Sequence, residues 1–323
     1  MRSRRLGRTG FEVSEIGHGL WGMGEWSGSN DADSLRALQL SVDLGCNFFD
    51  SAWAYGGGKS DGLLGELMKR NPGKRLYAAS KIPPKNDKWP ATSRDPLEDV
   101  FPRGHVRRHA ELILKALGTD AIDLLQFHVW DDSWAELESW QTTVRELKEN
   151  RVIRAFGISL NRWEPYNGIR ALRTGLVDTV QVIYNIFDQA PEDELFAVCR
   201  EMDVGVIARV PLDEGSLGGA FTKETRFPPN DWRSKYFGPE NLPPTLERVA
   251  ALKRELPPAL VLPEMALRFI LSSPQVHTAI VGMRRMEHVR QNLGVADQGA
   301  LPDHLLAALR KHRWDRRIKP WSD

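Results

Sequence analysis

The sequence predicts an α/β fold: a (β/α)8 TIM barrel, preceded by an N-terminal β-hairpin and carrying a long loop after its seventh strand. Eight short apolar runs alternate with helical patterns along the 323 residues. The runs are apolar throughout, as parallel strands are when helices cover both faces of a sheet. Eight such units favour a closed barrel over an open sheet. A barrel of this kind accounts for the whole length, so we expect one domain over residues 1–323.

The elements follow one another in a regular order. Residues 1–14 alternate around the turn Gly7-Arg8-Thr9-Gly10, which predicts the hairpin. The expected strands cover residues 15–20, 46–52, 76–82, 122–128, 153–159, 179–184, 205–210 and 278–281. The helical patterns between them cover residues 33–44, 60–69, 103–117, 133–149, 162–174, 192–202, 246–256 and 263–271.

Two segments depart from this rhythm. Residues 212–244 are rich in Gly, Pro and aromatic residues and follow the seventh strand, so we expect a functional loop over the C-terminal face of the barrel. Residues 301–323 are expected to form a C-terminal helix and a basic tail, which includes Arg310, Arg313 and Arg316. We interpret these charges as a solvated surface.

Composition excludes several classes of protein. Lys and Arg number 44 and Asp and Glu 43, and a dedicated nucleic-acid binder would carry a clear basic excess. Two cysteines, Cys46 and Cys199, exclude a disulfide scaffold and a four-cysteine zinc module, and no metal site is expected. The N-terminus carries no apolar run, and no stretch reaches the length of a membrane span. We expect a cytoplasmic protein with no membrane or nucleic-acid partner.

A rival motif occurs early in the chain. Residues 17–22 match G-x-G-x-x-G, and Asp50 stands later where a ribose-binding acid would, which is the pattern of an open-sheet dinucleotide-binding unit. That motif needs a helix directly after it, so that the helix amides meet the pyrophosphate. Here residues 23–30 intervene, and the helix is expected from about residues 31–33. Asp50 also lies about 28 residues beyond Gly22, against roughly 20 in the motif. The barrel is therefore favoured.

Four polar residues follow apolar runs at positions where the barrel would bring them together. They are Asp50, Tyr55, Lys81 and His128. A phenol is a weak acid at neutral pH, and a neighbouring ammonium group lowers its pKa by favouring the phenolate. A carboxylate would keep the lysine charged, and a histidine could orient a carbonyl oxygen. The set predicts proton delivery to an oxygen while a cofactor delivers hydride to carbon, since no side chain supplies hydride. Each residue alone is also compatible with a structural role.

The sequence resembles the aldo-keto reductase superfamily from about residue 6 to residue 293, and these four residues lie within the similar segments. The segments that carry the resemblance are LGRTG at 6–10, NFFDSAWAYG at 47–56, SK at 80–81, DLLQFH at 123–128, IRAFGIS at 153–159, VQVIYN at 180–185, VGMR at 281–284 and QN at 291–292. The resemblance implies a barrel that reduces aldehydes and ketones with NADPH, or runs the reverse reaction. It implies Tyr55 as the general acid, Lys81 and Asp50 as the residues that tune it, and His128 as the residue that orients the substrate carbonyl.

The resemblance also implies a set of cofactor-binding residues. Ser159 and Gln181 match the positions that hold the nicotinamide carboxamide, and Arg284, with Arg285, would bind the 2′-phosphate of NADP(H). The full set is Trp21, Asp50, Ser159, Gln181, Arg209, Pro211, Leu212, Gly215, Ser216, Gly282, Met283, Arg284, His288, Gln291 and Asn292.

Two positions depart from the family pattern. The family usually has Asn directly after the serine that matches Ser159, whereas here Leu160 follows and Asn161 comes one residue later. The family often stacks a tyrosine on the nicotinamide where this chain has Arg209. A guanidinium can stack on a ring, and its charge could also change hydride affinity or hold an acidic substrate.

The substrate and the reaction class leave alternatives open. Trp21, Trp53, Trp89 and Trp130 lie in or near the loops that follow strands and suggest an aromatic-lined pocket for a small molecule. Core packing is an equally good interpretation of any one of them. Arg209 and Lys59 would favour an anionic or sugar-like group. Aldehydes, ketosteroids, quinones and sugar lactols all remain candidates. A nicotinamide-sensing regulatory subunit of the same fold and a Schiff-base lyase that uses Lys81 are the two alternative functions.

Overall fold

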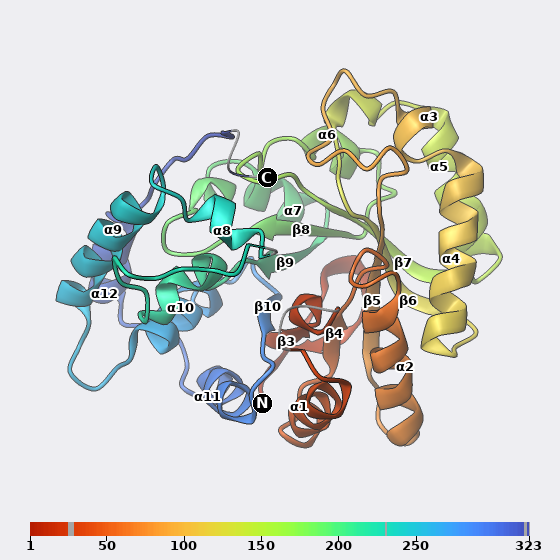
Figure 1. The fold of residues 1–323 in the computed structure, drawn as a ribbon. Helices are drawn as coiled ribbons and strands as arrows, with labels where there is room; N and C mark the ends of the chain where they lie inside the picture. Colours follow the sequence, from red (N-terminus) through yellow and green to blue (C-terminus); the bar gives the residue numbers. More distant parts are fainter. Residues whose placement is uncertain (25–28, 230, 320–321, 323) are drawn as a thin grey trace.

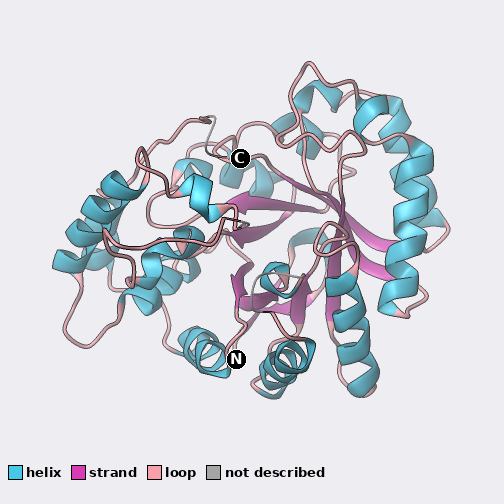
Figure 2. Ribbon diagram, in the orientation of Figure 1, coloured by secondary structure: helices cyan, strands magenta, loops and turns pink. Residues whose placement is uncertain are grey.

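Eight parallel strands close into a barrel at the centre of the molecule, with helices around it (Figures 1 and 2). The computed structural model describes residues 1–24, 29–229, 231–319 and 322. The barrel strands are β3 (Ile16–Gly19), β4 (Phe48–Asp50), β5 (Tyr77–Ile82), β6 (Ile122–Phe127), β7 (Ile153–Ser159), β8 (Thr179–Ile183), β9 (Gly205–Arg209) and β10 (Thr278–Gly282). Each strand pairs with the next along the chain, and β10 closes the barrel against β3. The predicted (β/α)8 fold is confirmed.

The predicted N-terminal hairpin is also confirmed, and it covers the bottom of the barrel. Strands β1 (Ser3–Arg5) and β2 (Glu12–Ser14) pair antiparallel across the turn Gly7–Thr9. Leu6 and Val13 are fully buried against side chains of the barrel strands, including Phe48 and Leu124. Because the hairpin fills the N-terminal end, the C-terminal ends of the strands remain as the open face for a site.

Helices cover the outside of the barrel. Asn30 begins α1 by accepting a hydrogen bond from the amide of Asp33 at 3.1 Å, and Gly118, in the left-handed region at φ 65°, ends α4. The helices are α1 (Asp31–Asp43), α2 (Lys59–Arg70), α3 (Leu97–Val100), α4 (Arg103–Leu117), α5 (Glu138–Glu149), α6 (Ile169–Arg173), α7 (Leu195–Glu201), α8 (Arg233–Tyr236), α9 (Leu242–Glu255), α10 (Leu262–Leu271), α11 (Met286–Gly294) and α12 (Asp303–Arg310).

Some predicted helices are shorter than their apolar patterns. The helix expected over 162–174 is wrong in its first half, because α6 begins only at Ile169. Pro165 cannot donate a backbone hydrogen bond there, and Gly168 lies so close to the Leu160 side chain that an added Cβ would be 2.6 Å away. The segment before α5 similarly forms a separate 3-10 turn over Asp132–Trp134.

The rival dinucleotide-binding motif is excluded by the fold. Residues 17–19 lie in β3, which pairs with β10 and β4 inside the closed barrel, and α1 begins at Asp31 as expected. Residues 25–28, which fall in the segment between the motif and α1, lie outside the described residues.

The long loop and the C-terminal segment both contain helical elements. Residues 212–244 contain a 3-10 segment (Asp213–Gly218), α8 and the start of α9, with residue 230 outside the described residues. The tail follows α12, and residues 320, 321 and 323 lie outside the described part. The interpretation of the tail as solvated is wrong for Arg316, whose side chain is 3% exposed and paired with Asp188 and Asp213. Across the described residues, no helix has the length and apolar character that a bilayer crossing requires.

Two glycines of α2 test the packing of the barrel's outer layer. A Cβ on Gly65 would lie 2.5 Å from the carbonyl oxygen of Ala116 in α4, whereas a Cβ on Gly62 would meet nothing within 4 Å. We expect Gly65→Ala to lower the free energy of unfolding by about 1–3 kcal/mol through overpacking. Gly62→Ala should raise it by roughly 0.5–1 kcal/mol through helix propensity. Urea unfolding of both variants measures this, and equal changes would contradict close α2–α4 packing at Gly65.

Candidate active site

The four residues predicted to carry chemistry meet at the C-terminal end of three neighbouring strands. Asp50 ends β4, Lys81 lies near the end of β5, and His128 directly follows β6. Tyr55 lies in the turn after β4. This is the face opposite the hairpin, where the loops that follow strands build sites in barrels of this kind.

A buried ion pair joins two of these residues. The Lys81 ammonium donates to the Asp50 carboxylate, and both side chains are almost completely buried, at 0% and 2% exposure. The same ammonium also donates to the backbone oxygen of Ser51 at 2.8 Å and contacts the hydroxyl oxygen of Tyr55 at 3.4 Å. Lys81 therefore links a carboxylate to a phenol. Tyr55 is half-buried and is the most exposed of the three residues.

The second carboxylate oxygen of Asp50 is held by two amides. Gln181 of β8 donates to it at 2.9 Å and Gln126 of β6 donates at 3.3 Å. The sequence analysis missed Gln126. The signal in the sequence was its position two residues before His128, which places the two side chains on the same side of the chain. In the barrel it is the register partner of Lys81. Gln181, expected at the nicotinamide carboxamide, here also fixes Asp50.

Burial and charge act in opposite directions on the lysine and the tyrosine. Burial by itself would lower the pKa of Lys81, but the Asp50 carboxylate and Tyr55 outweigh it, so the pKa is raised and the ammonium stays charged. Burial raises the pKa of Tyr55, and the Lys81 ammonium opposes that rise. The phenol is therefore protonated at neutral pH and lies beside the cation that would stabilise its phenolate.

His128 is neutral at physiological pH. Burial lowers the pKa of His128 well below 6.5, and the cations Lys81 and Arg209 lower it further. Its ring lies edge-to-face with Tyr55, at 5.6 Å between centroids, and with Trp89, at 4.7 Å. A neutral imidazole beside the phenol can donate a hydrogen bond to a carbonyl oxygen and so orient it.

The residues expected at the nicotinamide carboxamide lie on the next strands around the barrel. Ser159 ends β7 and is the register partner of Gln181 on β8. Arg209 ends β9, and its guanidinium donates to the backbone oxygen of Leu160 at 3.0 Å. The Asn161 amide nitrogen donates to the backbone oxygens of Ala91 and Trp130, whereas its buried Oδ1 has no hydrogen-bond partner among the described residues.

The residues expected around the pyrophosphate follow β9. Pro211 and Ser216 are buried, and Leu212 and Gly215 are half-buried. The Ser216 hydroxyl donates to the Asp213 carboxylate at 2.6 Å. Trp21, expected at the same face, lies edge-to-face with Trp232 of the long loop at 6.2 Å.

A cavity of about 550 Å³ opens where the adenosine end of a cofactor is expected. Arg284 and Arg285 line it at the start of α11, together with Ser29, Asn30, Asp33, Ser34, Arg36 and Met286. Arg36 pairs with Asp33, and the guanidinium groups of Arg284 and Arg285 form, with the N-terminal end of α11, a donor set that suits a phosphate. Burial lowers the pKa of Arg284, and the nearby cations Arg233 and Arg285 add to this, so an anion would relieve the repulsion.

The remaining expected residues of this region divide into exposed and buried groups. Gly282, His288 and Gln291 are exposed, with Gln291 bonded to Glu287 at 3.4 Å. Met283 is fully buried and Asn292 is 7% exposed. The exposed residues are available to a ligand from outside the barrel, and the buried ones support β10 and α11.

The tryptophans expected at the mouth do not all reach it. Trp130 is fully buried among core aromatic residues, so of the two interpretations core packing applies to it and the substrate pocket does not. Trp89 is 43% exposed beside His128, and Trp53 is half-buried against His109 of α4. The ammonium of Lys59 pairs with Asp31 at 3.1 Å.

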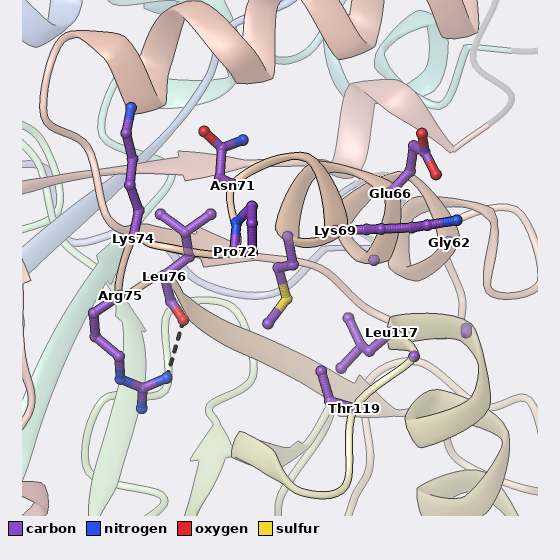
Figure 3. Close-up of a pocket in the computed structure, with 14 residues that line it drawn as sticks. Gly62, Glu66, Lys69, Asn71, Pro72, Lys74, Arg75, Leu76, Leu117 and Thr119 are labelled. Atoms are coloured by element: carbon purple, nitrogen blue, oxygen red, sulfur yellow. Dashed lines mark hydrogen bonds between the residues drawn. The ribbon is translucent and has the colours of Figure 1, made fainter.

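A second surface cavity, of about 530 Å³, lies away from this site. It is lined by α2 from Gly62 to Lys69, by the residues between α2 and β5, and by the C-terminal end of α4 with Thr119 after it (Figure 3). It therefore lies toward the N-terminal ends of the strands. Among the described residues, no cluster of three His, Cys, Asp or Glu side chains could hold a metal ion.

Comparison with known proteins places this barrel in a family. The sequence pattern of the Aldo/keto reductase family matches residues 15–313. The chain belongs to this family. It is 27% identical over 300 residues to "Aldo-keto reductase yakc [NADP(+)]" of Schizosaccharomyces pombe, which covers 90% of this chain and 86% of that protein. It is 26% identical over 317 residues to "NADH-specific methylglyoxal reductase" of Escherichia coli, which covers 91% of this chain and 93% of that protein.

The fold has a close counterpart among solved structures. Aldo-keto reductase AKR11C1 from Bacillus halodurans, in its holo form, superposes with a TM-score of 0.77 over 100% of both chains at 22% identity. Family membership supports nicotinamide-dependent reduction of carbonyl groups as the chemistry of this aldo-keto reductase.

Proposed function

We propose that the protein is an NADPH-preferring reductase of aldehydes or ketones, able to run the reverse reaction, in which Tyr55 is the general acid. The observation that carries the proposal is the buried Lys81 ammonium, which contacts Asp50 on one side and the Tyr55 hydroxyl, at 3.4 Å, on the other. The proposal takes residues 1–323 as one catalytic domain with a small-molecule substrate. The two free, buried cysteines are in keeping with a cytoplasmic location.

The side chains divide the work of proton transfer. A bound nicotinamide supplies the hydride for the carbonyl carbon. Tyr55 gives its phenolic proton to the carbonyl oxygen, so the O–H bond of the phenol breaks as that of the alcohol forms. Lys81 stabilises the resulting phenolate, Asp50 keeps the lysine charged and in place, and neutral His128 donates a hydrogen bond that holds the carbonyl oxygen in reach.

The residues around the strand ends fit a nicotinamide cofactor. Ser159 and Gln181 would hold the carboxamide, and residues 211–216 would lie along the pyrophosphate. Arg284 and Arg285 would bind the 2′-phosphate in the cavity at the start of α11. This cationic cavity supports a preference for NADPH. Because one relative is named for NADP(+) and another for NADH, the family alone does not decide the preference.

Removing the phenolic hydroxyl tests the mechanism. Tyr55→Phe should lower turnover of an activated aromatic aldehyde by about 10²-fold or more, because general acid catalysis contributes that much. NADPH binding, followed by quenching of tryptophan fluorescence, should stay unchanged. Tyr166→Phe is the matched control, since that hydroxyl lies outside the site and donates to Asp193. Turnover of Tyr55→Phe near the wild-type rate would overturn the mechanism. If the wild-type protein binds NADPH tightly but reduces no aldehyde, the regulatory alternative is favoured.

Cofactor preference has a separate test. Arg284→Ala should weaken NADPH binding by about 1–3 kcal/mol, the value of one charge-assisted contact, and should leave NADH binding nearly unchanged. Arg290→Ala, on the exposed part of the same helix, should alter neither dissociation constant. Equal loss for both cofactors would mean that Arg284 does not contact the 2′-phosphate.

A further inference from the structure

We propose that two arginines from distant parts of the chain, Arg316 of the tail and Arg162 after β7, are positioning residues for the cofactor. They hold and neutralise Asp213 and Glu214, so that these carboxylates neither repel the pyrophosphate nor release the turn that carries Gly215 and Ser216. This inference rests on the proposed function, because the function places the pyrophosphate along residues 211–216.

The segment after β9 has an unusual backbone. Asp213, Glu214 and Gly215 have φ of 46°, 56° and 104°, and Val210 just before them has φ of 55°. Only Gly215 adopts this left-handed region without a steric cost. The other residues need outside contacts to stay there, and such strained segments persist where the surrounding structure fixes them. The amides of Asp213 and Gly215 donate to the backbone oxygens of Val210 and Leu212, at 3.1 Å and 2.9 Å, so hydrogen bonds within the segment also fix this turn.

Arg316 supplies one of these contacts. Its guanidinium pairs with Asp188, from the loop after β8, and with Asp213 at 2.7 Å. It also contacts the hydroxyl oxygen of Tyr236 at 3.1 Å. The tail reaches this place because the amide of Trp314 donates to the backbone oxygen of Phe187 at 2.7 Å. In Figure 1 the tail runs from α12 past α9 toward α7.

Arg162 supplies the second contact. Its guanidinium donates to the Glu214 carboxylate at 2.8 Å, and the two side chains are only 12% and 11% exposed. The same guanidinium lies over the rings of Trp232 and Tyr236, at 5.1 Å and 5.0 Å from their centroids. Arg162 therefore joins the segment after β9 to the aromatic residues around α8.

Charge explains why the segment needs both arginines. Asp213 and Glu214 are acidic residues next to the place proposed for a doubly charged pyrophosphate, so without compensation they would repel it. Burial raises the pKa of Asp188, and the nearby Asp213 adds to this while Arg316 opposes it. Loss of Arg316 would leave the Asp188 and Asp213 carboxylates facing each other beside the cofactor.

Binding measurements on Arg316→Met test the inference in the full-length protein. We expect the dissociation constant for NADPH to rise about 10- to 30-fold, the effect of one uncompensated charge several ångströms from an anion. The dissociation constant for adenosine 2′-monophosphate, which lacks the pyrophosphate, should change less than about twofold. The kcat at saturating NADPH should also stay within about twofold, because Arg316 pairs with Asp188 and Asp213, not with Tyr55 or Lys81. Arg313→Met is the matched control, since Arg313 pairs with Asp193 and Asp315 on the surface of the same tail.

Companion variants separate a positioning role from a purely structural one. Arg316→Lys keeps the charge and should retain most of the NADPH affinity. Asp213→Asn combined with Arg316→Met removes one of the two uncompensated acids and should recover part of the NADPH affinity. Equal weakening of NADPH and adenosine 2′-monophosphate, or no change in either, would overturn the inference. Failure of the wild-type protein to bind any nicotinamide dinucleotide would instead overturn the proposed function.

Discussion

The buried ion pair between Lys81 and Asp50 is the constraint on which the rest of the site depends. Two charges inside a barrel are stable only when every remaining lone pair and proton has a partner. The turn after β4 provides the backbone oxygen of Ser51 and the Tyr55 hydroxyl, and β6 and β8 provide the amides of Gln126 and Gln181. The N-terminal hairpin closes the opposite end of the barrel. The ion pair can therefore act on a substrate from the C-terminal face alone.

The site has two halves that different parts of the chain build. The proton-transfer half comes from β4, β5 and β6, which are neighbouring strands of the barrel. The proposed cofactor half comes from β7 to β10, from the loop over residues 212–244 and from the C-terminal tail. Gln181 joins the halves, since it lies on β8 and donates to Asp50. Arg209 joins them electrostatically, because its charge lowers the pKa of His128 across the mouth of the barrel.

Local patterns were enough to predict the barrel, its hairpin and the meeting of Asp50, Tyr55, Lys81 and His128, because residues that end parallel strands converge whatever the loops do. Features set by tertiary contact were not predictable. The helix expected from residue 162 does not form until Ile169, after Pro165 and Gly168. Trp130 matched a loop position and is buried in the core. Arg316 lies in a basic stretch that was interpreted as solvated, but it is buried against acidic partners more than a hundred residues away in sequence.

The most direct measurement of the central claim is the turnover number of Lys81→Met at saturating NADPH and aldehyde, beside the charge-neutral double variant Lys81→Met/Asp50→Asn. If the ammonium tunes Tyr55, both variants should turn over about 10²-fold or more slowly, while fluorescence quenching shows NADPH still bound. In the double variant, Asp50→Asn removes the carboxylate that Lys81→Met leaves unpaired, so a slow turnover cannot be attributed to that charge. A kcat within threefold of wild type in either variant would contradict the account.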